Sequence, residues 1–189
     1  MKTLIIVFSL IMSQLLFSTA SATTILPITL EQLSTRASLI FYGKVISNQV
    51  KKDAQSGRIA TFTKFEVIDL IKGQAGHTHT IKQIGGIDKE SNIQLLIHGV
   101  PEFHNGEEYV VFLPEKSVLG FSSPLGLHQG RFSVSTVNNE HMVSNGRNMS
   151  QQSEMMRRNV QVPLAVQADK PSYSRLDDFI NTVRAYNTP

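Results

Sequence analysis

Two histidines, His77 and His79, are the side chains in this sequence whose types and spacing best suit chemistry. Residues two apart in a strand lie on the same face, about 6 to 7 Å apart, so both imidazoles could bind one Zn²⁺ or Cu²⁺ ion. A third ligand would be needed. The candidates are His98, His104, His128 and His141. The alternative is that His77 and His79 are solvent-facing residues at the start of a polar strand.

No other motif in the sequence predicts a catalytic residue or a cofactor. A serine nucleophile on a constrained Gly-x-Ser-x-Gly turn is absent. The glycine pair Gly85-Gly86 is not followed by the Lys-Ser/Thr of a phosphate-binding loop. Two adjacent glycines are better explained by a bulge or a sharp corner between strands.

Composition excludes several further classes of function. The chain has 189 residues and no cysteine, which excludes disulfides, thiolate metal sites, thiol catalysis and a lipid anchor on cysteine. Its formal net charge is only +3, so a nucleic-acid partner is not expected.

The N-terminus has the pattern of an export signal. Lys2 precedes an apolar run that ends at Phe17, and residues 20–22 form a small-x-small cleavage site. We expect cleavage after Ala22 and a periplasmic or extracellular mature protein. The apolar run is shorter than the roughly 20 residues that span a bilayer, so no membrane span is expected.

Hydrophobic periodicity predicts the elements that position these residues. A short helix is expected from Thr29, which can cap it while Gln32 reaches back, to about Ser38. From Leu39 onward apolar and polar residues alternate, as in a strand with one face in the core. A second strand is predicted at 59–71, and because it exceeds the usual five or six residues we expect a bulge in it.

More strands and a second helix follow. Strands are predicted at 77–84, 93–100, 109–113, 131–135 and 140–143. The stretch 109–113 is continuously apolar, which indicates that both of its faces are buried. Ser174 is expected to cap a C-terminal helix. The apolar face of that helix would consist of Leu176, Phe179, Ile180 and Val183.

The order of these elements predicts a mainly β fold. We expect a small antiparallel, OB-like barrel of five to seven strands, with a short N-terminal helix and a C-terminal helix. The predicted organisation is a signal peptide at 1–22, a β-barrel domain at 23–143, a polar flexible connector at 144–173 and the helix at 174–189.

The ordered landmarks resemble a family of uncharacterised secreted bacterial proteins with a β-rich domain. The resembling segments are 30–33, 37–45, 65–73, 85–86, 99–103, 106–113 and 129–134. More distantly, the Gly43-Lys44-Val45 strand end and the Lys72-Gly73 end of the next strand are similar to netrin-like and tissue-inhibitor-of-metalloproteinases domains. That resemblance implies an OB-type barrel and a secreted peptidase as partner. Those inhibitors chelate zinc through an N-terminal cysteine, which this chain lacks.

The export signal, the β pattern and the missing catalytic motifs together predict a secreted or periplasmic, non-enzymatic protein-binding module. Loops between strong strands usually carry binding residues. The residues expected to contact a partner are Gly85, Gly86, Asp88, Pro101, Phe103 and His104. The alternatives are a metal-dependent hydrolase or metal-binding protein built on His77 and His79, and a structural component of the cell envelope.

Overall fold

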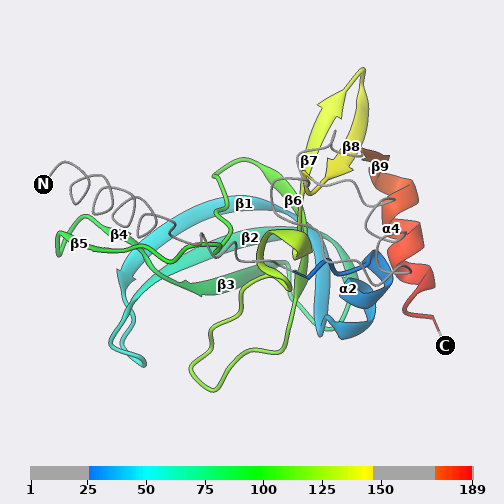
Figure 1. Ribbon diagram of the computed structural model, residues 1–189. Helices are drawn as coiled ribbons and strands as arrows, with labels where there is room; N and C mark the ends of the chain where they lie inside the picture. Colours follow the sequence, from blue (N-terminus) through cyan, green and yellow to red (C-terminus); the bar gives the residue numbers. More distant parts are fainter. Residues whose placement is uncertain (1–25, 147–172, 189) are drawn as a thin grey trace, which may run out of the picture.

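The computed structural model describes residues 26–146 and 173–188 (Figure 1). The predicted signal peptide at 1–22 and most of the predicted connector at 144–173 lie outside these residues. None of the helices in the described ranges is long and apolar enough to cross a membrane.

The described residues form a mainly β structure with two α-helices, as the sequence predicts. The helices are α2 (Leu30–Arg36) and α4 (Leu176–Ala185), with a 3-10 turn η1 (Leu127–Gly130). The strands are β1 (Leu39–Lys52), β2 (Ile59–Lys72), β3 (Thr78–Ile84), β4 (Gly86–Asp88), β5 (Ile93–Leu95), β6 (Glu108–Leu113), β7 (Arg131–Val137), β8 (Glu140–Ser144) and β9 (Ser174–Arg175). Seven strands make one antiparallel sheet in the order β3-β2-β1-β6-β7-β8-β9, and β4 pairs with β5 in a separate sheet.

The predicted OB-like barrel is not confirmed. The end strands β3 and β9 do not pair, and no closed barrel forms among the described residues. The reason lies in β7, which continues into a hairpin with β8 that projects from the body of the sheet instead of returning to β3 (Figure 1). The outer edge of β3 instead receives one backbone hydrogen bond from a loop, from the Ser122 N–H to the Lys82 carbonyl at 2.9 Å.

The bulge predicted for the second strand is confirmed as a set of register shifts between β1 and β2. The pairing skips Ile68 and Ile71 on β2 and Ile46 on β1. Each extra residue interrupts the alternation of faces and bends the strand pair. As a result Ile46 and Ile68, apolar by type, are about half exposed, at 48% and 50%.

The sheet separates two apolar cores. Along β6 the side chains alternate, so that Val110 and Phe112 enter one core while Tyr109, Val111 and Leu113 enter the other. All five are at most 1% exposed, which confirms the strand buried on both faces. The first core is covered by α2 and α4 (Figure 1). The second is rich in aromatic residues and is built from β1, β2, β3, β6 and the segment that follows β5.

The two helices match the sequence to different degrees. The capping box at Thr29 and Gln32 is present, with both reciprocal hydrogen bonds. The predicted cap at Ser174 is wrong, because Ser174 and Arg175 pair with β8 as the short strand β9 and α4 begins at Leu176 without a side-chain cap. The predicted apolar face of α4 is confirmed, since its four residues are buried.

Candidate functional site

The glycine pair turns the chain out of β3 and into the β4–β5 hairpin. Gly85 and Gly86 have φ values of +97° and +129°, where residues with side chains are strained. A Cβ on Gly86 would lie 2.6 Å from both Thr61 Oγ1 and Val50 Cγ1. The pair therefore acts as the corner that the sequence predicts, and it lets the hairpin lie directly on the ends of β1 and β2.

The predicted fourth strand at 93–100 is wrong beyond Leu95. β5 contains only Ile93, Gln94 and Leu95, and it pairs with β4 rather than with the main sheet. Residues 96–107 are a loop that runs back across the aromatic core before β6 begins.

A cavity of about 310 Å³ lies under this hairpin, and we call it the hairpin cavity. Its apolar lining includes Val50, Ile87, Leu96, Ile97, Val100 and Phe103. Polar side chains also line it, but they hold the surrounding loops in place. Thr63 donates to Asn48 at 2.6 Å, Asn48 donates to the Phe103 carbonyl at 2.7 Å, and Gln83 donates to the Pro101 carbonyl at 3.2 Å. Because these polar groups are already hydrogen-bonded to one another and to the loop backbone, the surface left to face a ligand is mainly apolar.

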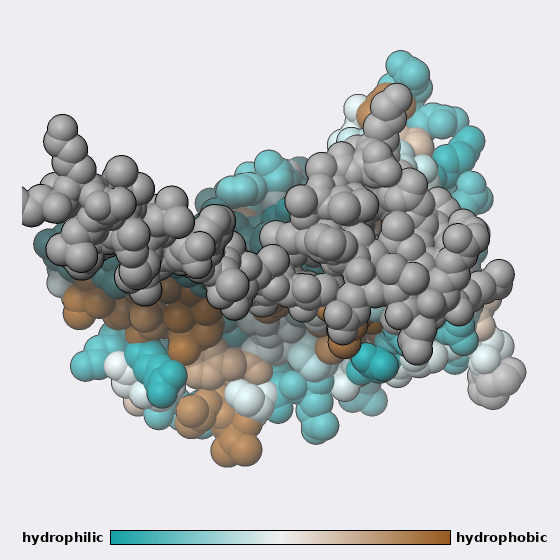
Figure 2. Space-filling model, in the orientation of Figure 1, coloured by the Kyte–Doolittle hydropathy of each residue, from teal (hydrophilic) through white to brown (hydrophobic). Residues whose placement is uncertain are grey.

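Four aliphatic side chains beside this cavity are exposed, and we call them the hairpin patch. They are Ile87, Ile93, Leu96 and Ile97, at 54%, 49%, 63% and 40% exposure. Figure 2 shows hydrophobic surface at the end of the molecule that carries β4 and β5 in Figure 1. Three of the four also line the hairpin cavity, so the patch and the cavity form one apolar region.

The predicted partner-binding residues separate into two groups. Gly85, Gly86, Pro101 and Phe103 all line the hairpin cavity, although they come from two loops. Phe103 is only 5% exposed, because its ring packs edge-on against Phe65 and Tyr109 with centroids 5.1 Å away in each case. Its contribution is therefore to the cavity wall rather than to the outer surface.

Asp88 and His104 are not among the residues that line the cavity. Asp88 is 6% exposed and accepts hydrogen bonds from the Ser91 hydroxyl at 2.5 Å and the Glu90 N–H at 3.2 Å. The Ser91 hydrogen bond lowers the pKa of Asp88, which keeps it an acceptor for the hairpin loop. His104 is exposed, and its backbone N–H donates to the Tyr109 hydroxyl at 3.3 Å. Both residues shape loops.

Sequence reasoning did not single out the aliphatic residues of the hairpin patch. One signal was available, because residues 95–97 are three consecutive aliphatic residues and cannot all occupy a single face of a strand. Either both faces had to be covered or some of these side chains had to be exposed.

The candidate metal ligands lie at the other end of β3. His77 is exposed and precedes the strand, whereas His79 is partly buried against the Phe41 ring, with centroids 5.5 Å apart. Burial, and then the charge of Lys116, lower the pKa of His79. The Nε2 atom of His79 is buried with no hydrogen-bond partner among the described residues. Across those residues, no group of three or more His, Cys, Asp or Glu side chains is placed to hold a metal ion.

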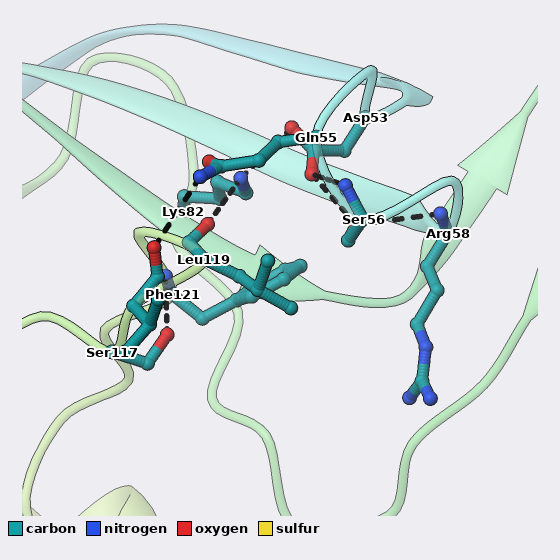
Figure 3. A network of polar contacts seen from close by, with 9 residues as sticks. Asp53, Gln55, Ser56, Arg58, Lys82, Ser117, Leu119 and Phe121 are labelled. Carbon is teal, nitrogen blue, oxygen red and sulfur yellow. Dashed lines mark hydrogen bonds and ion pairs between the residues drawn. The ribbon is translucent and has the colours of Figure 1, made fainter.

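A network of polar contacts fixes a turn beside the β1–β2 connection (Figure 3). Lys82 forms an ion pair with Asp53 at 2.8 Å and donates to the Leu119 carbonyl at 2.6 Å. Its ammonium group also lies 4.5 Å from the centre of the Phe121 ring. Gln55 donates to the Val118 carbonyl at 3.3 Å. These contacts attach a loop that follows β6 to the turn between β1 and β2.

Comparison of the chain with models of known protein families and with curated proteins finds no match. The function is therefore inferred from the geometry of the described residues and from the sequence.

Proposed function

We propose that this protein is an exported, non-enzymatic module that binds another protein through the hairpin patch and the hairpin cavity. The observation that carries the proposal is the exposure of four aliphatic side chains, Ile87, Ile93, Leu96 and Ile97, around one apolar cavity. Exposed apolar residues that gather around a cavity are typical of an interaction site. Export rests on the predicted signal peptide, and a secreted peptidase is the partner class that the distant resemblance suggests.

The backbone of the hairpin favours a polypeptide as the ligand. β4 and β5 pair only with each other among the described strands, so each leaves one edge without a strand partner. An extended peptide can add to such an edge, with its backbone satisfying the free N–H and C=O groups and alternate side chains reaching the apolar surface. A lipid tail offers no partner for these backbone groups. The proposed ligand is therefore an extended segment with apolar side chains, one of which enters the hairpin cavity.

Selection of random peptides displayed on phage tests this proposal. We expect the chain from Thr23 to enrich peptides with alternating apolar residues, and we expect Leu96→Asp to weaken their binding at least tenfold. Burying a leucine is worth about 1.5 to 3 kcal/mol, and a tenfold change in affinity corresponds to about 1.4 kcal/mol. Val137→Asp is the matched control, because Val137 is also exposed, at 47%, but lies in the β7–β8 hairpin.

Three results would contradict the proposal. The first is that the selection enriches no peptide. The second is that the Leu96→Asp and Val137→Asp variants bind the enriched peptides with equal affinity. Sedimentation could also show a dimer that Leu96→Asp converts to a monomer, in which case the patch binds a second copy of the chain. Circular dichroism of both variants establishes that the fold is intact.

A further inference from the structure

The turn held by the Lys82 network exposes apolar side chains where turns are normally polar. The Gly120 N–H donates to the Ser117 carbonyl at 2.7 Å and the Ser117 N–H donates to the Phe121 carbonyl at 2.9 Å, which closes a tight turn. Its two central residues are Val118 and Leu119, at 95% and 41% exposure. Central positions of turns favour Gly, Pro, Asn, Asp and Ser, so two aliphatic residues there are unusual.

The turn is fixed in place before any ligand arrives. Gln55 and Lys82 hold the Val118 and Leu119 carbonyls, and the Ser117 hydroxyl accepts a hydrogen bond from the Phe121 N–H at 3.0 Å. Because its backbone is already ordered, insertion of the two side chains costs little further conformational entropy. Figure 1 shows this turn beside the β1–β2 turn, and Figure 2 shows hydrophobic surface at its tip.

Four basic residues flank the two adjacent turns in the sequence. Lys51, Lys52 and Arg58 flank the β1–β2 turn, and Lys116 precedes Ser117 by one residue. All four are exposed, and none forms an ion pair with another described residue. Of the two acidic residues in these segments, Asp53 is already paired with Lys82, which leaves only Glu115.

We propose that Val118 and Leu119, with the flanking Lys51, Lys52, Arg58 and Lys116, dock the protein on an anionic lipid surface. We call this set the basic tip. The two aliphatic side chains enter the boundary between headgroups and acyl chains, while the basic residues contact the headgroups. Nucleic acid fits less well, because aliphatic side chains offer no ring on which bases can stack. A convex tip also needs a matching pocket in a protein, whereas a lipid surface deforms around it.

The absence of tryptophan from the chain allows a direct test. In the chain from Thr23, Val118→Trp introduces a single tryptophan at the tip, and Val137→Trp places one on the β7–β8 hairpin as a matched control. With vesicles of phosphatidylcholine and phosphatidylglycerol we expect a blue shift and quenching by brominated lipids for Val118→Trp only. Vesicles of phosphatidylcholine alone should give neither effect.

Binding measurements on the chain without tryptophan complete the test. Val118→Asp should reduce the partition coefficient on anionic vesicles at least tenfold, and Lys116→Gln about fivefold, as expected for one basic residue at an anionic surface. Leu96→Asp in the hairpin patch should leave vesicle binding unchanged, which separates this proposal from the peptide-binding one. High salt should weaken the binding.

The proposal is overturned if Val118→Trp responds no more than Val137→Trp, or if binding is equal on neutral vesicles. It is also overturned if Val118→Asp and Lys116→Gln both bind as the parent chain does. Lys116→Gln guards against a folding artefact, because the exposed Lys116 side chain makes no hydrogen bond or ion pair with another described residue.

Discussion

Replacement of Phe179 by alanine tests whether α4 packs on the sheet in solution. Phe179 is 3% exposed, and its ring centroid lies 4.7 Å from that of Phe132 and 6.3 Å from that of Phe112. Removing a buried phenylalanine costs about 3 to 5 kcal/mol, because the apolar transfer energy is lost and a cavity remains. A domain of this size is stable by about 5 to 15 kcal/mol, so the variant should lose a large part of its stability.

Urea unfolding followed by far-UV circular dichroism measures this effect. With a slope of about 2 kcal/mol per molar urea, a loss of about 4 kcal/mol moves the midpoint down by about 2 M. Phe179→Leu should cost only about 1 to 1.5 kcal/mol, since it keeps most of the volume and loses the ring contacts.

The control for this measurement is Asn181→Ala, on the exposed side of the same helix. A substitution at such a site changes stability by about 0.5 kcal/mol or less. If Phe179→Ala and Asn181→Ala shift the midpoint equally, then α4 does not cover the first core in solution and the packing of that core is refuted.

Two more predictions concern the β1–β2 turn and the glycine corner. The hydrogen bonds from Lys82 and then Ser56 lower the pKa of Asp53 from 3.8 to about 2. Their stabilising contribution is therefore complete above about pH 3.8 and is lost as the pH falls toward 2. Lys82→Met should raise the pKa of Asp53 toward 3.8, as followed by the carboxyl carbon shift in NMR, and an unchanged pKa would exclude this cause. Gly86→Ala should lower the free energy of unfolding by about 1 to 3 kcal/mol. Gly57→Ala should lower it less, because a Cβ at Gly57 would meet nothing within 4 Å. Equal losses of stability in urea unfolding would contradict a steric role for the glycine corner.

Local patterns predicted much of the fold. The long alternating runs predicted β1 and β2, the continuous apolar run predicted β6 as buried on both faces, and Thr29 with Gln32 predicted the start of α2. These features depend on neighbours in sequence, so the residues themselves carry the information.

Features that depend on distant partners could not be predicted in the same way. β4, β5 and β9 have only two or three residues each, too few for a period to be detected. The order of strands depends on which strands pair with one another. The sheet is open because β7 pairs with β6 and β8 and neither end strand, β3 or β9, closes it into a barrel. Phe103 is in a predicted loop, and only the aromatic rings of other strands show that it belongs to the core.

The candidate site could be predicted only in part, because it too combines local turn signals with contacts between segments far apart in the sequence. Glycines and prolines identified two loops, and four of their residues do line one cavity. Three of the four hairpin-patch residues, Ile93, Leu96 and Ile97, fall in the predicted strand at 93–100, because a short apolar run has the same pattern whether it is buried or exposed.

The two cores on opposite faces of the sheet have a consequence for the order of folding during synthesis. The aromatic core is built from segments that end with β6, so it can form while the chain is still growing. The other face, with Phe112 and Phe132, waits for α4, the last described helix to be made. Until then the nascent protein exposes an apolar surface, and transiently exposed surfaces of this kind promote aggregation. One face of the sheet is therefore complete once β6 has been made, whereas the other stays uncovered until the residues of α4 are available.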